Sequence, residues 1–347
     1  MNSCLTTWGI FVNSHTMQQQ TIKIKTMKWV LIIGTLLMGI KFYAYFLTQS
    51  NAILTDAIES IVNVLAGMFA LYSLYYAARP KDEDHPYGHG KIEFLSSGVE
   101  GGMIFLAGIA MLIKGAIAFF HPEPIHHIDI GLYLSAFSGI VNYIMARVLI
   151  ARGNALHSST MVADGKHLMT DTWSSVGLVI GLILIYFTQI FWIDYVITIL
   201  LGLLITYTGF GLIKESIFNL LDKTDYIKIE HLITFLNSKR KLSWIDIHNL
   251  RVVKYGSVVH VDCHMTLPWY FSLEEAHKEV DALGQLALQE LNYQIEFFIH
   301  ADPCLPHSCT ICQLMDCKER KRDFVKKLNW DMQNVLPDSK HSVNSVQ

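Results

Sequence analysis

Long apolar segments separated by short polar loops occupy the first two thirds of the chain. An α-helix rises 1.5 Å per residue, so about 20 apolar residues span a bilayer core ~30 Å thick. Segments of about this length or longer occur at residues 29–47, 52–76, 94–120, 130–150, 160–187 and 190–213. The pattern predicts an all-α membrane bundle of six transmembrane helices, in which the third and sixth segments are plain hydrophobic spans.

The pattern changes in the last third of the chain. Residues 259–265 alternate between apolar and polar side chains after a turn at residues 254–257, which is typical of a strand in a hairpin. Ser272 and Glu275 have the spacing of a capping box that begins a helix. The order helix, strand, strand, helix, strand therefore indicates a small α+β domain.

These patterns divide the chain into four regions. We expect a flexible leader at residues 1–27, the six-helix domain at 28–224, the α+β domain at 225–303 and a Cys-rich tail with a disordered end at 304–347. The leader lacks the basic start, apolar run and cleavage site of a secretory signal. Met17 and Met27 are alternatives to Met1 as the translation start.

Composition and charge support a membrane protein with both termini in the cytoplasm. The chain is 52% hydrophobic and 16% charged, with a mean hydropathy of +0.33. Lys and Arg occur before the first segment and in every second loop, whereas loops 49–51, 121–129 and residue 189 contain neither, which orients the bundle. A net charge of −3 without a basic stripe argues against a nucleic-acid partner.

Two of the apolar segments carry the same spacing of polar residues, i, i+3 and i+7. The spacing places each set along one stripe of a helix. An ionisable side chain in the bilayer costs at least ~3 kcal/mol on insertion scales, so it rarely persists without a function. The second segment contains Asp56, Glu59 and Asn63, and the fifth contains Asp164, His167 and Asp171.

If the two segments are neighbours, Glu59 and Asn63 face His167 and Asp171. Four such ligands, with two negative charges, suit a divalent transition metal. Asp56 and Asp164 then lie one turn away, as gating or supporting groups or in a structural role. The alternatives for the main set are a proton site and hydrogen bonding between helices for packing alone.

The sequence Ala-Asp-Gly-Lys-His-Leu-Met-Thr-Asp at residues 163–171 resembles the cation diffusion facilitator family, and the resemblance covers residues 28–304. It implies a homodimeric transporter with a ferredoxin-like, metallochaperone-like cytoplasmic domain, which exports a divalent metal from the cytoplasm in exchange for protons. A bacterial inner membrane is the expected location. Zinc carriers of the family usually have His or Asp followed by Asp where this chain has Glu59 and Asn63, so the metal could be Zn²⁺ or Fe²⁺, with Mn²⁺ or Co²⁺ as alternatives.

The loop after the second segment contains the sequence His-Pro-Tyr-Gly-His-Gly-Lys at residues 85–91. By the same resemblance, Asp82, His85 and His89 bind a second ion. The alternative is a Gly-rich turn whose histidines cap the next helix. The resemblance also implies that Lys91 pairs with Asp222 and stabilises the dimer.

The α+β domain and the tail contain further candidate ligands. Positions that bind regulatory zinc in relatives match His248, His264, His277, His300 and Asp302, although single surface histidines are usually only solvated. The tail contains Cys304, His307, Cys309, Cys312 and Cys317, a spacing that favours zinc over disulfides in the cytoplasm. Reactive or idle thiols are the alternative.

Two other functional classes are less consistent with the sequence. An intramembrane metallohydrolase would need an activated water and typically a His-Glu-x-x-His motif, which the sequence lacks. A metal sensor without transport would explain the α+β domain and the tail but not the polar stripes within the bilayer. We therefore expect a transporter, without enzymatic activity or an organic cofactor.

Overall fold

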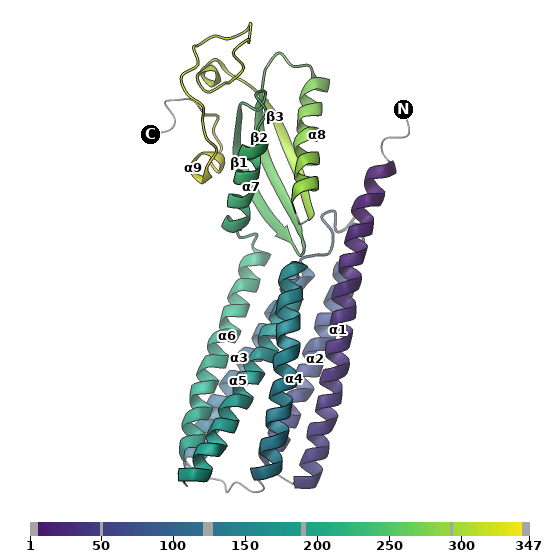
Figure 1. Ribbon diagram of the computed structural model, residues 1–347, viewed down its shortest axis with the longest axis vertical. Coiled ribbons are helices and arrows are strands. Elements are labelled where there is room, and N and C mark those ends of the chain that lie inside the picture. The colour runs from purple at the N-terminus through teal and green to yellow at the C-terminus, as the bar shows by residue number, and fades with distance from the viewer. Residues whose placement is uncertain (1–5, 49–50, 121–127, 189–191, 292–293, 342–347) are drawn as a thin grey trace. The chain divides into compact units, whose positions relative to one another are not determined.

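The computed structural model describes residues 6–48, 51–120, 128–188, 192–291 and 294–341, with some side chains in these ranges outside the description. The chain divides into a first unit, Met1–Leu221, and a second unit, Asp222–Gln347. The first unit is a bundle of long helices (Figure 1). They are α1 (Thr6–Thr48), α2 (Asn51–Ala77), α3 (Ile92–Phe120), α4 (Ile128–Ala155), α5 (Ser159–Thr188) and α6 (Trp192–Leu220).

Each of the six predicted apolar segments is helical over the residues that the structure describes, the sixth of them from Trp192 onward. Within the described residues, two helical stretches are long and apolar enough to cross a membrane by themselves, Gln19–Tyr43 and Ile92–Ile117. The third segment, 94–120, is not a plain hydrophobic span, since it contains the buried Glu100, and Glu93 directly before it is buried as well.

The predicted flexible leader is helical from Thr6 onward, because α1 continues back through residues 6–27. Lys23 is fully buried, and its Nζ lies 3.1 Å from Glu93 Oε1. Ser158 donates a hydrogen bond to the other carboxylate oxygen of Glu93 at 2.5 Å. A buried ion pair whose atoms are all satisfied ties α1 to α3 and to the start of α5. The sequence pattern missed this contact because the polar run around Lys23 looks solvated.

Close approach of α3 and α6 depends on small residues, as is common between membrane helices. A Cβ atom at Gly108 would lie 2.6 Å from the backbone nitrogen of Thr206, and one at Gly209 would lie 2.5 Å from the backbone nitrogen of Phe105. Ser216 also donates a 2.6 Å hydrogen bond to the carbonyl of Phe94. These two helices are therefore packed backbone to backbone.

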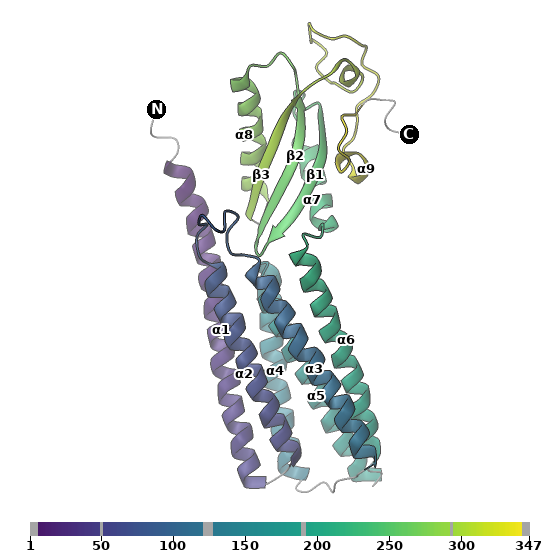
Figure 2. The same ribbon diagram turned by 180° about the vertical axis from the view of Figure 1, so that it is seen from behind.

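The second unit has the predicted order of helices and strands. It contains α7 (Tyr226–Lys239), β1 (Asp246–Tyr255), β2 (Val258–Leu267), α8 (Leu273–Glu290) and β3 (Gln294–Pro303). The sheet order is β1-β2-β3, with β1 antiparallel and β3 parallel to β2 (Figure 2). Asp225 caps α7, and the capping box of Ser272 and Glu275 begins α8 as predicted.

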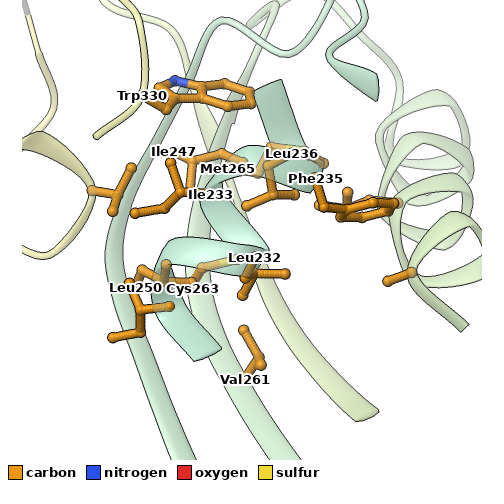
Figure 3. Close-up of a cluster of buried hydrophobic side chains, with 14 of the residues drawn as sticks. Leu232, Ile233, Phe235, Leu236, Ile247, Leu250, Val261, Cys263, Met265 and Trp330 are labelled. Carbon is orange, nitrogen blue, oxygen red and sulfur yellow. The ribbon is translucent and has the colours of Figure 1, made fainter. Parts of the chain in front are cut away.

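One face of the sheet carries the hydrophobic core of the second unit. Val259, Val261, Cys263 and Met265 alternate along β2 and pack with buried side chains from both α7 and α8, so the two helices cover the same face. Figure 3 shows this cluster, in which Leu232, Phe235 and Leu236 of α7 lie against the strand residues. A small mixed sheet with helices on one face agrees with the predicted α+β class.

The tail is described up to His341, and its last residues, 342–347, lie outside the description, so its predicted disordered end stays a prediction. It forms η1 (Pro306–Thr310) and α9 (Met332–Val335). Trp330 is 2% exposed and lies over the cluster in Figure 3. Asn237 donates to the Trp330 carbonyl at 2.7 Å, and the Arg240 guanidinium lies 4.0 Å from the indole. The tail is therefore part of the second unit's core.

Candidate functional site

The polar stripes of α2 and α5 meet inside the first unit. Asn63 Nδ2 donates a hydrogen bond to Asp171 Oδ2 at 2.6 Å, and Asn63 Oδ1 accepts one from His167 Nε2 at 2.8 Å. His167 Nδ1 lies 4.0 Å from Asp171 Oδ1. His167 is buried, and Asn63 and Asp171 are half-buried. The contact predicted between the two stripes is therefore present for three of its four residues.

The other residues of the stripes are only partly described. The side chains of Asp56 and Glu59 lie outside the described part of the chain, so their predicted roles stay predictions. Asp164 is 3% exposed and, together with Asn63, lines a cavity of about 40 Å³. A cavity of this size holds a water molecule or an ion with little of its hydration shell.

Three further polar residues in the bundle were missed by the sequence reasoning. Lys41 of α1 and Asn142 of α4 are buried and line the cavity that contains Asn63 and Asp164. Glu100 of α3 is 1% exposed, and neither of its carboxylate oxygens has a hydrogen-bond partner among the described residues. The available signal was one or two isolated charged or amide residues within each of these apolar segments, without the repeat that marked α2 and α5.

The three predicted loop ligands converge. Asp82 contacts both histidines, with Oδ1 2.9 Å from His85 Nδ1 and Oδ2 3.2 Å from His89 Nε2. One ligand atom from each residue lies within 4.8 Å of the others. The hydrogen bond with the His85 side chain holds the pKa of Asp82 below its usual value, so the carboxylate is charged at neutral pH. Three potential ligand atoms, two from imidazoles and one from a carboxylate, therefore converge in this loop.

A second cluster follows one row of the sheet in the second unit. His248, His264 and His300 are register partners on β1, β2 and β3. Asp302 Oδ2 lies 3.3 Å from His248 Nε2 and 3.2 Å from His264 Nδ1, and Asp302 Oδ1 lies 3.5 Å from His300 Nε2. Burial lowers the pKa of His248, which keeps its imidazole neutral and able to bind a metal.

The fifth predicted residue of that cluster is elsewhere, and the tail supplies residues in its place. His277 is 72% exposed on α8, where it pairs with Asp281 at 3.5 Å. Asp338 has a ligand atom within 4.8 Å of those of His248 and His264. His341 Nδ1 lies 2.9 Å from Asp246 Oδ2. The sequence could not place these tail residues, because they reach the sheet through tertiary contacts alone.

Two remaining predictions have different outcomes. Lys91 lies in the first unit and Asp222 begins the second, so their predicted pairing stays a prediction. In the tail, all four predicted cysteines border one cavity, whereas His307 does not line it. None of the five described cysteines forms a disulfide.

Two family models match the chain. Residues 27–221 match the cation efflux transmembrane domain, which is more than half of the sequence. Residues 238–304 match the cytoplasmic domain of cation efflux proteins. The stripes and the loop cluster lie within the first match, and the histidines of the sheet lie within the second.

Individual relatives are similar over most of their length. The uncharacterized transporter sll1263 of Synechocystis is 33% identical over 256 residues, which cover 73% of this chain and 83% of that protein. The cation-efflux pump FieF of Shewanella oneidensis is 28% identical over 269 residues, or 77% of this chain and 89% of the pump. The manganese efflux system protein MneS of Bacillus subtilis is 24% identical over 269 residues, or 77% and 91%.

Proposed function

The chain belongs to the cation diffusion facilitator family of divalent metal efflux transporters, and we propose that it exports Zn²⁺ or Fe²⁺ from the cytoplasm in exchange for protons. The observation that carries the proposal is the contact of Asn63 with His167 and Asp171 between α2 and α5. The members of this family are transporters rather than enzymes, so the metal is the substrate.

The ion replaces the hydrogen bonds of this contact. Asn63 Oδ1, His167 Nε2 and the carboxylate oxygens of Asp171 are all atoms that ligate transition metals. The His167 and Asp171 atoms already lie within hydrogen-bond distance of the Asn63 side chain. Glu59 completes the four ligands and brings the negative charge to two. A divalent ion then neutralises the buried set, which lowers the cost of holding two carboxylates away from water.

The ligand types narrow the choice of metal. One imidazole, two carboxylates and an amide suit Zn²⁺, Fe²⁺, Co²⁺ and Mn²⁺ better than Mg²⁺ or Ca²⁺, which prefer all-oxygen ligands. The name of MneS, a manganese efflux protein, makes Mn²⁺ a serious second candidate. The imidazole of His167 favours the softer ions, and for this reason we place zinc and iron first.

Transport proceeds by alternating access between the two sides of the membrane. The site takes the ion from the cytoplasm, and protons compete for His167 and the carboxylates on the other side. Imidazole gains a proton near physiological pH, so a modest pH gradient changes its occupancy. The sequence contains no Gly-x-x-x-x-Gly-Lys motif, which is consistent with an ion gradient as the energy source.

The proposed membrane arrangement follows the charge of the loops. All of α1 to α6 cross a bacterial inner membrane, and both termini lie in the cytoplasm because the basic loops are on that side. The chain works as a homodimer through the second unit, which matches a cytoplasmic domain of this family. Lys91 and Asp222 stabilise the dimer near the membrane surface.

The two accessory clusters sense or store the same metal. Asp82, His85 and His89 bind an ion in the cytoplasmic loop, and the cluster of His248, His264, His300 and Asp302 binds a regulatory ion. Their support is geometric, since His85 and His89 both contact Asp82, and three histidines of the second cluster contact Asp302. Asp338 adds a carboxylate to the second cluster, which raises its negative charge.

Replacing Asn63 with Asp should shift the metal ranking toward Mn²⁺. The amide now donates to Asp171 at 2.6 Å, and a second carboxylate at this distance would repel Asp171 unless an ion or a proton lies between them. The harder, more negative site should compete for Mn²⁺ about tenfold better, which corresponds to ~1.4 kcal/mol. Uptake of Zn²⁺ into proteoliposomes in the presence of Mn²⁺ measures the change.

Asn154→Asp is the matched control, because it makes the same chemical change at an exposed position near the end of α4. Its metal ranking should equal that of the unmodified protein. An unchanged ranking in Asn63→Asp would mean that Asn63 does not contact the ion.

A further inference from the structure

Four thiols in the tail surround one cavity. Cys304, Cys309, Cys312 and Cys317 line a space of about 250 Å³ at the surface of the second unit, beside Trp269 and Tyr270. The four cysteines are spaced by four, two and four intervening residues. The matched cytoplasmic domain ends at residue 304, so three of these cysteines lie beyond every part of the chain that the family accounts for.

The backbone that carries the thiols is held in place by the fold. The Cys304 amide donates to the carbonyl of Leu267 at 2.8 Å, which extends the pairing of β2 and β3. The guanidinium of Arg320 donates to four carbonyls, those of Cys309 at 2.8 Å, Cys312 at 3.1 Å, Leu314 at 2.8 Å and Arg322 at 3.4 Å. A loop fixed in this way presents its cysteines without the entropy cost of an unstructured segment.

The chemistry around the cavity suits a thiolate-bound cation. Four thiolates and one Zn²⁺ carry a net charge of −2. Arg320 and Lys321 also line the cavity and offset this negative charge, whereas Glu319 adds one negative charge.

We propose that Cys304, Cys309, Cys312 and Cys317 bind one structural Zn²⁺ per protomer, which fastens the tail to the second unit and takes no part in transport. No three of the four sulfur atoms lie within 4.8 Å of one another, so the side chains must rotate toward the cavity to form a tetrahedral site. His307 is not a ligand, because it does not line this cavity. The tight hold of four thiolates suits a structural ion and not a carrier site.

The test compares the metal content of the purified full-length protein with that of Cys309→Ser/Cys312→Ser. After dialysis against a weak chelator, mass spectrometry should find one zinc ion fewer per protomer in the double variant. Cys263→Ser is the matched control, since Cys263 is a buried cysteine of the same unit that lies in the hydrophobic core, and His307→Ala is a second control. Both controls should retain the ion. Metal flux into proteoliposomes should be the same in the unmodified protein and in any folded variant.

A measurement on the unmodified protein keeps the test independent of folding. Alkylation with peptide mapping should show Cys304 and Cys317 protected by zinc and released by a strong chelator. Replacing zinc by Co²⁺ should give the sulfur-to-metal charge-transfer absorption of a thiolate site. Three results would each overturn the zinc assignment. They are thiols that zinc does not protect, disulfides among these cysteines in protein purified without oxygen, and iron bound with inorganic sulfide and seen by its visible absorption.

Discussion

Replacing Asp171 with Asn should reduce metal transport by about 100- to 4000-fold, although the side chain keeps its shape. Removing one partner from a buried set of charges costs about 3–5 kcal/mol, and each 1.4 kcal/mol corresponds to a factor of ten. The amide can still accept the hydrogen bond from Asn63, which is 2.6 Å long in the unmodified protein, so the packing of α2 on α5 should survive. Uptake of Zn²⁺ and Fe²⁺ by proteoliposomes measures the loss.

Two variants separate charge from packing. Asp171→Glu keeps the charge and should retain partial activity, while Asp323→Ala removes a carboxylate from an exposed part of the tail and should transport normally. Size-exclusion chromatography shows whether each variant is still folded. Transport at the unmodified rate by Asp171→Asn would contradict the assignment of Asp171 as a ligand.

Replacing Trp330 with Ala should destabilise the second unit by about 3–5 kcal/mol, the usual cost of deleting a large buried aromatic side chain. Trp330 is 2% exposed, lies over the core in Figure 3 and stacks on the Arg240 guanidinium. Its loss leaves a cavity beside Leu236 and Ile247. The tail should then detach from the sheet.

Cys263 reports this change without any added label. It is buried in the same core, and burial raises the pKa of its thiol to about 12, so alkylation requires local opening. The alkylation rate of Cys263, followed by peptide mapping, should rise by roughly 100- to 4000-fold in Trp330→Ala. Leu273→Ala, at an 88% exposed position, should leave the rate unchanged. An unchanged rate in Trp330→Ala would show that the tail contributes nothing to the core.

The features that were predictable from sequence are those set by local periodicity. Spacing of i, i+3 and i+7 placed each polar set on one face of its helix and, on the assumption that the two helices are neighbours, predicted that Asn63 faces His167 and Asp171, as it does. Alternation along β2 and the capping box of α8 likewise predicted the second unit. In both cases the information lies within a few neighbouring residues.

Features set by tertiary contact were not predictable in this way. Leu328, Trp330 and Val335 of the tail are scattered among charged residues and follow no period, so their burial could not be predicted from the sequence. Lys23 was assigned to a flexible leader, although its ammonium group is buried against Glu93. The contribution of Asp338 to the histidine cluster depends on how the tail returns to the sheet.

The most direct test of the central claim is metal flux under an imposed pH gradient. Purified protein in sealed proteoliposomes should move Zn²⁺ or Fe²⁺ across the membrane, with protons moving the opposite way, and the flux should stop when the gradient is collapsed. The same vesicles with Asp171→Asn should show neither flux. Metal binding without transport, or transport of equal size in the variant, would contradict a proton-coupled site at Asn63, His167 and Asp171.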